Sequence, residues 1–557
     1  MIVTPVLEPG AHPGQGPLSR AMHSWPVIVT ALVLLCLLLW LPGFTTIGPM
    51  DRDESRFAQA TTQMLETGDF VDISFQDEAR HKKPVGIYWL QVAAVTAVGS
   101  GTDSPIWVYR LPSLFGAIAA VLITAFLGAA MFDRRVGFLA GAALATTVIL
   151  GVEARLAKTD AVLLACLVAS QWALWHLWSR RDEVAGSNGW WVLFWLALGA
   201  AILVKLQPLL ALFTILALVA WERRLDWLRR LRPVYGLLVL ALVVAPWFVL
   251  ILVQSEGAFL QASLGDDIFA KVLEGQATHG APPGTYLLAM WATAWPFVAL
   301  VPLALVWLWR HRHDDRAKFL LAWIVPFWLV FELVATKLPH YVMPTYPALA
   351  IAAAAALVTL ERRRPWLIGL PVAITVLVGL GLAAAAVVVT HLLDAPLTFA
   401  IWTGAGVGAV LLFLAARAAW AGSWRGSAAS FAALAVVVYA TLYGHVFPGA
   451  KALWLSPAMA EAVRIYAPCP NPTVASTGYH EPSAVFLIGT DLRLIGPDAA
   501  ADLMRDVPCT LVFVDDRQQA AFQDALEVPV RTLTTLHGWR LNGGRWTTLT
   551  LYGNQPG

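Results

Sequence analysis

Long apolar runs separated by short charged connections recur through this 557-residue sequence as far as residue 446. A helix needs about 20 mostly apolar residues to cross the hydrocarbon core of a bilayer, and the first run, residues 25–44, has that length. Only 13% of the residues are charged, against about 25% in a typical soluble domain. The sequence therefore predicts an integral membrane protein that crosses the bilayer many times.

The apolar candidates are spread along most of the chain. A window of about 19 residues finds them at residues 25–44, 84–100, 111–132, 136–152, 161–178, 190–204, 209–221, 234–253, 286–309, 319–336, 346–360, 366–390, 397–416 and 428–446. From these we expect an all-α polytopic membrane domain, residues 25–448, with about thirteen transmembrane helices. The net charge of +2 is too small to indicate nucleic-acid binding.

Basic connections alternate with connections of another character. The basic set is Arg134-Arg135, Arg180-Arg181, residues 223–232, 310–318 and 362–364, and Arg417 with Arg425. The positive-inside rule places this set in the cytoplasm. The other set then faces outward: residues 153–160, 205–208, 254–285, 337–345 and 391–396, and everything after residue 448. Residues 1–24 lack the pattern of a cleaved signal peptide and are expected to be a cytoplasmic tail.

The segment 84–100 decides on which side the first connection lies. If it crosses the membrane, residues 45–83 face the cytoplasm, an arrangement that Arg80, Lys82 and Lys83 favour by charge. The segment is short, however, and begins with a proline followed by tyrosine and tryptophan, which suits an interfacial helix. We therefore expect it to lie at the membrane surface, so that residues 45–110 form one outward-facing connection.

From residue 449 the hydropathy falls and the pattern becomes that of a water-exposed domain. Short buried strands are predicted at residues 473–476, 484–488 and 510–514, a helix at 516–526, and a hairpin at 530–552 around Asn542-Gly543-Gly544. We expect residues 449–557 to form an α/β domain on the outer side.

The four cysteines fall into two pairs. Cys36 and Cys166 lie within apolar runs, where a free thiol packs as a small apolar side chain. Cys469 and Cys509 lie in the C-terminal domain, each after a proline and just before a predicted strand. Because the outer compartment should be oxidising, we expect a disulfide between them; the alternative is two buried free thiols.

Three groups of ionisable residues lie at the outer edge of the membrane domain. Charged side chains at mid-span cost roughly 2.5–3.5 kcal/mol each, so such residues at or near membrane depth usually mark function. The first group, residues 51–58, contains Asp53, Glu54 and Arg56, and its alternative interpretation is a solvated loop.

The second and third groups combine basic and aromatic residues. Glu78, His81 and Lys83 precede Tyr88, a combination that could also anchor to lipid headgroups. Residues 337–347 interleave basic and tyrosine side chains with prolines, which predicts a rigid break where the chain re-enters the membrane.

Together these groups resemble the GT-C superfamily of polyprenyl-phosphate-dependent glycosyltransferases, and within it the protein O-mannosyltransferase-like branch. That branch has Asp-Glu-x-Arg-aromatic-Ala, Lys-Pro-Pro-x-x-Tyr-Trp, Arg-Leu-Pro-Ser and Lys-x-Pro-x-Tyr-x-x-Pro-x-Tyr-Pro elements. The matching residues here are 53–58, 83–89, 110–113 and 337–347, with Val85 in place of the second proline. The likeness is greatest to the transferases that move 4-amino-4-deoxy-L-arabinose onto lipid A, and it covers the C-terminal domain poorly.

This resemblance implies an active site at the periplasmic face of a bacterial inner membrane. Asp53 would be the main acidic residue, with Glu54 beside it and a second acidic position at Asp160. The residues implied to bind the phosphate or the lipid are Arg56, Lys83, Lys337, Tyr341, Tyr346, Tyr88 and Arg110. The loop 254–285 would close over the site.

The implied reaction transfers 4-amino-4-deoxy-L-arabinose from undecaprenyl phosphate to a lipid A phosphate, which would confer resistance to polymyxin and other cationic peptides. The expected partners are the lipid-linked sugar donor, lipid A and membrane lipids, and the protein is expected to be a monomer. A transition state of this kind resembles an oxocarbenium ion, with negative charge growing on the leaving phosphate. Asp53 would orient or stabilise charge for an ionised acceptor, but act as a general base for a hydroxyl acceptor.

The sequence leaves open whether the protein binds a metal and which of several functions it has. No cofactor is required by the chemistry, but a divalent metal is an alternative because Glu78, His81 and His279 are suitable ligands, without metal-specific spacing. The alternative functions are a related transferase acting on protein Ser/Thr or an envelope glycan, a lipid or solute transporter, and a structural scaffold. Transporters tend to show internal repeats and mid-membrane polar sites, whereas here the charge gathers on one face.

Overall fold

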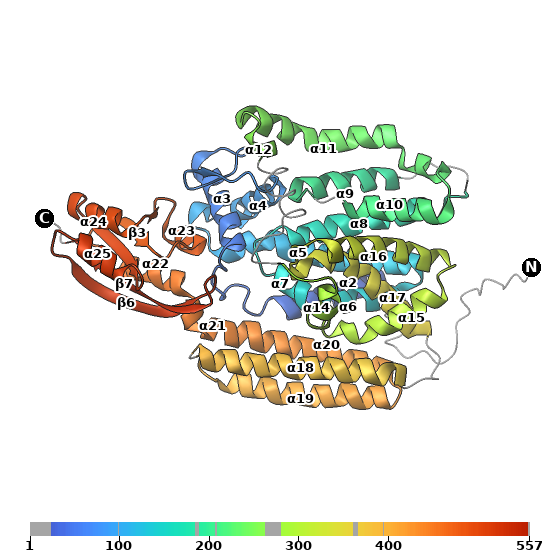
Figure 1. Ribbon diagram of the computed structural model, residues 1–557. Helices are drawn as coiled ribbons and strands as arrows, with labels where there is room; N and C mark the ends of the chain where they lie inside the picture. Colours follow the sequence, from blue (N-terminus) through green and yellow to red (C-terminus); the bar gives the residue numbers. More distant parts are fainter. Residues whose placement is uncertain are drawn as a thin grey trace, which may run out of the picture.

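A computed structural model describes residues 24–98, 100–183, 189–206, 209–261, 280–359, 366–393 and 395–554. Most of the membrane domain's helices run side by side, and the C-terminal domain sits at one end of the bundle (Figure 1). This confirms the predicted architecture of a helical membrane domain followed by a small α/β domain.

Seven of the described helical segments are long and apolar enough to cross a membrane, or eight if one bent pair counts as a single span. The long helices are α5 (Ile106–Met131), α8 (Asp160–Trp178), α11 (Pro233–Gln254), η5 with α17 (Pro339–Thr345 and Tyr346–Thr359), α18 (Trp366–Leu392), α19 (Phe399–Trp420), and α20 (Trp424–Thr441) with its π-helical extension η6 (Leu442–Val446) and α21 (Phe447–Gly449). Shorter apolar helices are α2 (Trp25–Trp40), α4 (Gly86–Val98), α9 (Trp190–Val204) and α10 (Leu209–Glu222). The remaining helices of this domain are α3 (Asp53–Thr67), α6 (Arg134–Ala145), α7 (Val148–Glu153), α12 (Ala258–Leu260), α14 (Thr285–Thr293), α15 (Val301–Arg310) and α16 (Asp315–Leu333), with short 3-10 turns η1 (Gly101–Asp103), η2 (Asp226–Leu231) and η4 (Phe297–Leu300).

Two of the predicted continuous spans are broken. Residues 286–309 divide into α14 and the η4–α15 unit, which are bent by 120°. Pro296 lies at this break and has no N–H with which to continue a helix. Residues 136–152 divide into α6 and α7 at Thr146 and Thr147, whose hydroxyls donate to the carbonyls of Ala143 and Leu144. Local bonds of this kind compete with the helical ladder.

Close packing of α5 on α8 aligns the ends of both helices. A Cβ added at Gly116 in α5 would lie 2.8 Å from the Cα atom of Val162 in α8. Small residues allow such close approach of helix backbones in membranes. Consequently Arg110 near the start of α5 and Asp160 at the start of α8 lie at the same end of the bundle.

The C-terminal domain is built on a mixed five-stranded sheet in the order β4-β3-β5-β7-β6. Its elements are η7 (Lys451–Leu453), α22 (Leu455–Tyr466), β3 (Thr473–Thr477), α23 (Pro482–Ile488), β4 (Arg493–Leu494), α24 (Pro497–Asp506), β5 (Thr510–Asp515), α25 (Gln519–Ala525), β6 (Arg531–Arg540) and β7 (Arg545–Gly553). Strands β4, β3 and β5 are parallel, and β7 joins β5 and β6 antiparallel. Cys469 and Cys509 are joined by a disulfide.

Residues 484–488 were predicted as a strand, and this was wrong. The structure forms the helix α23 there, with Pro482 in its first turn and Gly489 after its last residue. Proline fits the first turn of a helix because its missing N–H would have no partner there.

The C-terminal domain docks on α3 and on the short hairpin β1 (Ser74–Phe75) and β2 (Glu78–Ala79). Gln59 Nε2 donates to Thr490 Oγ1 at 2.7 Å, and Gln76 Nε2 donates to the Leu492 carbonyl at 2.7 Å. The Ser483 N–H donates to Asp51 Oδ1 at 3.1 Å. Residues 45–83 therefore lie on the same side of the bundle as the C-terminal domain.

Candidate active site

Asp160, the first residue of α8, is surrounded by three basic side chains at this end of the bundle. Lys205 Nζ lies 2.8 Å from Asp160 Oδ1, and Lys158 Nζ lies 3.8 Å from Oδ2. His340 Nε2 lies 3.6 Å from Oδ1. The carboxylate itself is 5% exposed. A buried charge is costly unless it is paired, and the neighbouring basic side chains supply this pairing.

Glu153 extends the same cluster from the end of α7. Its Oε1 atom lies 3.2 Å from Lys158 Nζ and 3.7 Å from His340 Nδ1. Its Oε2 atom is buried and has no hydrogen-bond donor among the described residues. Such an atom costs free energy unless a ligand or water supplies the donor. We call Glu153, Lys158, Asp160, Lys205 and His340 the charge cluster.

Asp53 lies in the first turn of α3, beside the charge cluster. It is exposed, and it makes no hydrogen bond or ion pair within the described ranges. Its charge acts on Lys158 and His340. The preceding Arg52 has φ 67° and ψ −97°, a conformation that is unfavourable for a residue with a side chain. The chain thus turns sharply to present an open carboxylate next to the cluster.

Glu54 and Arg110, both predicted to act on the substrate, instead bind each other. Arg110 Nε donates to Glu54 Oε1 at 2.8 Å and Nη2 donates to Oε2 at 3.0 Å. Each residue is 1% exposed. The guanidinium also donates to the carbonyls of Phe44, Ile47 and Gly48. The pair therefore fixes the connection between α2 and α3 and leaves no free donor for a phosphate.

Side chains of three helices hold the loop that carries Lys158. Glu54 Oε1 accepts the Ala157 N–H at 2.8 Å, and Gln91 Nε2 donates to the Ala157 carbonyl at 3.3 Å. Ser113 Oγ donates to the Lys158 carbonyl at 3.0 Å. Helices α3, α4 and α5 thus each position the loop between α7 and α8, and with it the ammonium group of Lys158.

The side chains of the motif at residues 337–347 have different environments. Lys337 Nζ donates to the Glu332 and Val334 carbonyls at 2.9 and 2.6 Å, so it caps the C-terminal end of α16. Tyr346 is buried, with its hydroxyl 2.6 Å from Thr293 Oγ1. Tyr341 packs edge-on against His340 at 5.0 Å between ring centroids, and Lys205 Nζ lies 5.7 Å from the centre of its ring.

A second basic group lies along the start of α3 and the hairpin. Arg56 is half-buried, and its pKa is lowered, chiefly by burial and then by the charge of Arg80. Arg80 stacks over the Phe57 ring at 5.1 Å. Its Nε atom and the Tyr88 hydroxyl are both buried without a hydrogen-bond partner in the described structure. Lys83 is half-buried and precedes α4. These groups could donate to an anionic ligand.

Two of the three residues proposed as metal ligands, Glu78 and His81, lie in the described part of the chain. His81 Nε2 lies 2.7 Å from Asp72 Oδ1, whereas Glu78 is exposed on β2. His279 lies outside the described residues, as does most of the loop 254–285. Among the described residues, no group of three or more His, Cys, Asp or Glu side chains could hold a metal ion.

Sequence reasoning did not assign Glu153, Lys158 and Lys205 to the site, and it placed His340 at the outer interface without linking it to Asp160. The sequence did contain a clue, because each of these residues lies at the outward end of an apolar run. An ionisable side chain is costly at such a position and usually marks a functional site. What the sequence did not show is that segments 45 and 180 residues beyond Asp160 would converge on it (205 − 160 and 340 − 160).

The sequence motifs indicated a resemblance to the GT-C superfamily, and three comparisons with known proteins bear on it. Residues 25–259 match the family model of dolichyl-phosphate-mannose-protein mannosyltransferases. The matched segment carries Asp53, Arg110, Lys158, Asp160 and Lys205. The resemblance to the mannosyltransferase-like branch is therefore confirmed.

More particular relatives are undecaprenyl phosphate-alpha-4-amino-4-deoxy-L-arabinose arabinosyl transferases. The protein of Erwinia tasmaniensis is 30% identical over 307 residues, covering 54% of this chain and 54% of its own length. The protein of Edwardsiella ictaluri is 28% identical over 371 residues, covering 65% of this chain and 64% of its own length. The chain thus spans about 54% of the length of the first of these relatives.

Solved structures extend the likeness to nearly the whole chain. ArnT from Cupriavidus metallidurans, bound to undecaprenyl phosphate, has a TM-score of 0.73 at 19% identity, covering 95% of this chain and 98% of that one. The Archaeoglobus fulgidus oligosaccharyltransferase in complex with Zn and sulfate has a TM-score of 0.51 at 11% identity, covering 95% and 73%. The protein therefore shares the fold of this ArnT structure over nearly the whole chain, including the C-terminal domain.

Proposed function

We propose that this protein transfers 4-amino-4-deoxy-L-arabinose from undecaprenyl phosphate to a lipid A phosphate at the periplasmic face of a bacterial inner membrane. The observation that carries the proposal is the charge cluster beside the open carboxylate of Asp53. It lies in a fold shared, over 95% of the chain, with a transferase bound to undecaprenyl phosphate. Adding a cationic sugar to lipid A lowers its negative charge, which supports a role in polymyxin resistance.

The reaction breaks the bond between the anomeric carbon and the oxygen of undecaprenyl phosphate, which leaves with the electron pair. The anomeric carbon then bonds to an oxygen of the acceptor phosphate. Positive charge on the sugar and negative charge on the leaving phosphate develop together. Arg56, Lys83 and the Arg80 Nε donor would stabilise the phosphate, because preorganised donors act most strongly where charge develops.

The carboxylates of Glu153 and Asp53 would interact with the sugar. The 4-amino group is cationic, and the unpartnered Oε2 atom of Glu153 is a buried acceptor within the charge cluster. Asp53 is open to the outside and would face the ring or the incoming acceptor. A lipid A phosphate is already ionised and needs no general base. The expected role of Asp53 is thus electrostatic and orienting.

The test is the substitution Asp53→Asn in a strain that lacks its own transferase. We expect loss of lipid A modification and of polymyxin resistance, with normal amounts of protein in the membrane. The matched control is Asp77→Asn, which changes an exposed acidic residue in the turn between β1 and β2. Near-normal lipid A modification by the Asp53→Asn protein would show that Asp53 is not part of the active site.

A second candidate function is glycosylation of protein Ser/Thr or of an envelope glycan. It is favoured by the match of residues 25–259 to a protein mannosyltransferase family. A hydroxyl acceptor requires a general base within hydrogen-bond reach, and Asp53 would then take that role. Mass spectra of lipid A and of envelope glycoproteins, from cells with and without the protein, distinguish the two. If neither lipid A nor the envelope glycoproteins are modified, but the distribution of lipids between the membrane leaflets changes, the protein would instead be a lipid transporter.

A further inference from the structure

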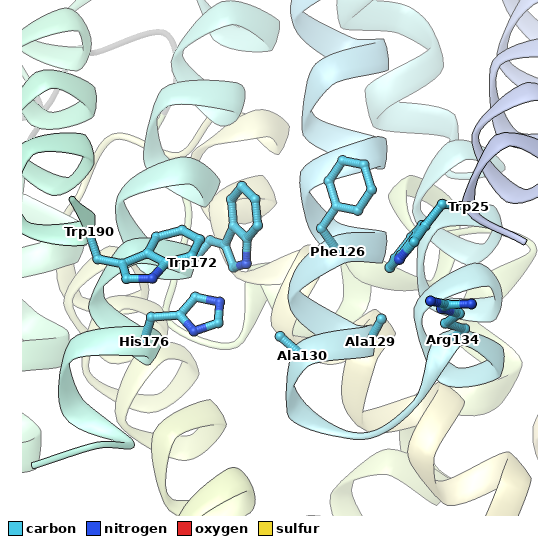
Figure 2. Close-up of a pocket in the computed structure, with 8 residues that line it drawn as sticks. All are labelled: Trp25, Phe126, Ala129, Ala130, Arg134, Trp172, His176 and Trp190. Carbon is cyan, nitrogen blue, oxygen red and sulfur yellow. The ribbon is translucent and has the colours of Figure 1, made fainter. Parts of the chain in front are cut away.

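A pocket lies at the opposite end of the bundle from the charge cluster. It has a volume of about 460 Å³ and aromatic walls formed by Trp25, Phe126, Trp172 and Trp190 (Figure 2). Helix α5 runs from Arg110 near the candidate active site to Phe126 at the pocket. At about 1.5 Å per residue, the 16 residues between them (126 − 110) correspond to about 24 Å. The pocket is therefore separate from the candidate active site.

The aromatic walls are packed against one another and so have a defined shape. The ring centroids of Trp25 and Phe126 are 4.7 Å apart, and those of Phe126 and Trp172 are 5.8 Å apart. Trp190 stands edge-on to Trp172 at 5.0 Å. Figure 2 shows Ala129 and Ala130 between the two ends of the pocket, where their small side chains leave space.

Three hydrogen-bond donors belong to this apolar pocket. The Trp172 Nε1 atom is buried and has no hydrogen-bond partner in the described structure. Arg134 stands at one end of the pocket, its guanidinium 5.5 Å from the centre of the Trp25 ring. His176 stands at the other end and is stacked on Trp190 at 3.9 Å. A buried indole N–H costs free energy unless an acceptor reaches it.

We propose that this pocket binds one anionic phospholipid from the leaflet opposite the C-terminal domain. The phosphate would accept from Trp172 and pair with Arg134, while the start of the acyl chains would lie along Phe126. Indole rings favour the membrane interface, where one edge is apolar and the other meets polar groups. The neighbouring basic connections attract anionic lipid. By the positive-inside rule this leaflet is the cytoplasmic one.

Native mass spectrometry of the full-length protein, released from detergent and titrated with lipid, tests this proposal. Wild-type protein should bind one phosphatidylglycerol about tenfold more tightly than phosphatidylcholine with the same acyl chains. Trp172→Phe keeps the aromatic wall and removes only the N–H; it and Arg134→Ala should each weaken phosphatidylglycerol binding by about tenfold. Inorganic phosphate at the same concentration should not compete.

Arg312→Ala is the matched control, because Arg312 also stacks on a tryptophan, 4.7 Å from the centre of the Trp309 ring, but lies outside the pocket. It should leave phosphatidylglycerol binding unchanged. Equal binding of the two lipids by wild-type protein would overturn the proposal without any variant. So would unchanged binding in the Trp172→Phe protein, an equal loss in the Arg312→Ala protein, or displacement by inorganic phosphate.

Discussion

At the scale of single residues, two adjacent carboxylates in one motif have opposite surroundings. Asp53 is exposed, whereas Glu54 is 1% exposed and accepts hydrogen bonds from Arg110 and from two backbone N–H groups, those of Met50 and Ala157. The difference follows from position on a helix, since neighbouring residues point about 100° apart at 3.6 residues per turn. One residue of the motif therefore meets solvent while the next holds the structure together.

Arg110→Ala should destabilise the protein strongly. It leaves the Glu54 carboxylate buried without its ion pair and removes the donor from three backbone carbonyls. Breaking a buried pair in this way costs about 3–5 kcal/mol. The measurement is the thermal unfolding midpoint of the protein in detergent. Arg505→Ala, which breaks an exposed ion pair on α24, should leave the midpoint unchanged; an equal effect of the two changes would contradict this role.

At the scale of elements, the candidate site depends on how α5 and α8 meet. The backbones of the two helices are in close contact at Gly116, and the loop before α8 is held by side chains of α3, α4 and α5. The distance between the two helix axes therefore sets the position of Asp160 relative to Asp53.

Gly116→Ala should force α5 and α8 apart. The added Cβ would meet the Val162 backbone at 2.8 Å, and overpacking of this kind costs typically about 1–3 kcal/mol. We expect a lower unfolding midpoint and transfer activity reduced by about tenfold, since small displacements of reacting groups are costly. Gly406→Ala in α19, where a Cβ would meet nothing within 4 Å, should be neutral. Full activity of the Gly116 variant would show that the helix spacing tolerates change.

The sequence predicted most elements, and its errors have local causes. Residues 484–488 are an apolar run, which suits a buried strand or a helix equally, and only the proline at position 482 favours the helix. The prediction of a single span for residues 286–309 was wrong, because hydropathy measures apolar character and cannot detect a 120° bend between two helices. Of the site, Asp53 and Asp160 were predicted from motifs. The contacts of Lys205 and His340 with Asp160 were not predicted, because the spacing of residues in a sequence does not show ion pairs between distant segments.

At the scale of the whole molecule, the C-terminal domain rests on the helix that carries Asp53. Asp51 lies at this contact, and burial, together with the charge of Glu481, raises its pKa from 3.8 to about 6 against the opposing effect of the Ser483 hydrogen bond. A raised pKa means that the folded state prefers the protonated carboxyl. This contribution to the free energy of unfolding is complete below about pH 4 and declines as the pH rises. It is lost above about pH 6.

Asp51→Asn should remove this part of the pH dependence. The difference in unfolding free energy between pH 4 and pH 7 should shrink by an amount on the order of 2–3 kcal/mol, from a shift of about two pKa units. The unfolding midpoints of wild-type and variant protein in detergent, measured from pH 4 to pH 8, give this difference. Parallel curves for the two proteins would mean that Asp51 is not perturbed at the contact.

Thr490 contacts Gln59 in α3, and Ser483 contacts Asp51, two residues before that helix. Both contacts join segments more than four hundred positions apart in the chain. Anyone who trims the protein to its lipid-embedded part for easier handling also releases the first turn of that helix. The C-terminal domain therefore supports the helix that carries Asp53, and shortened versions should be judged by transfer activity as well as by yield.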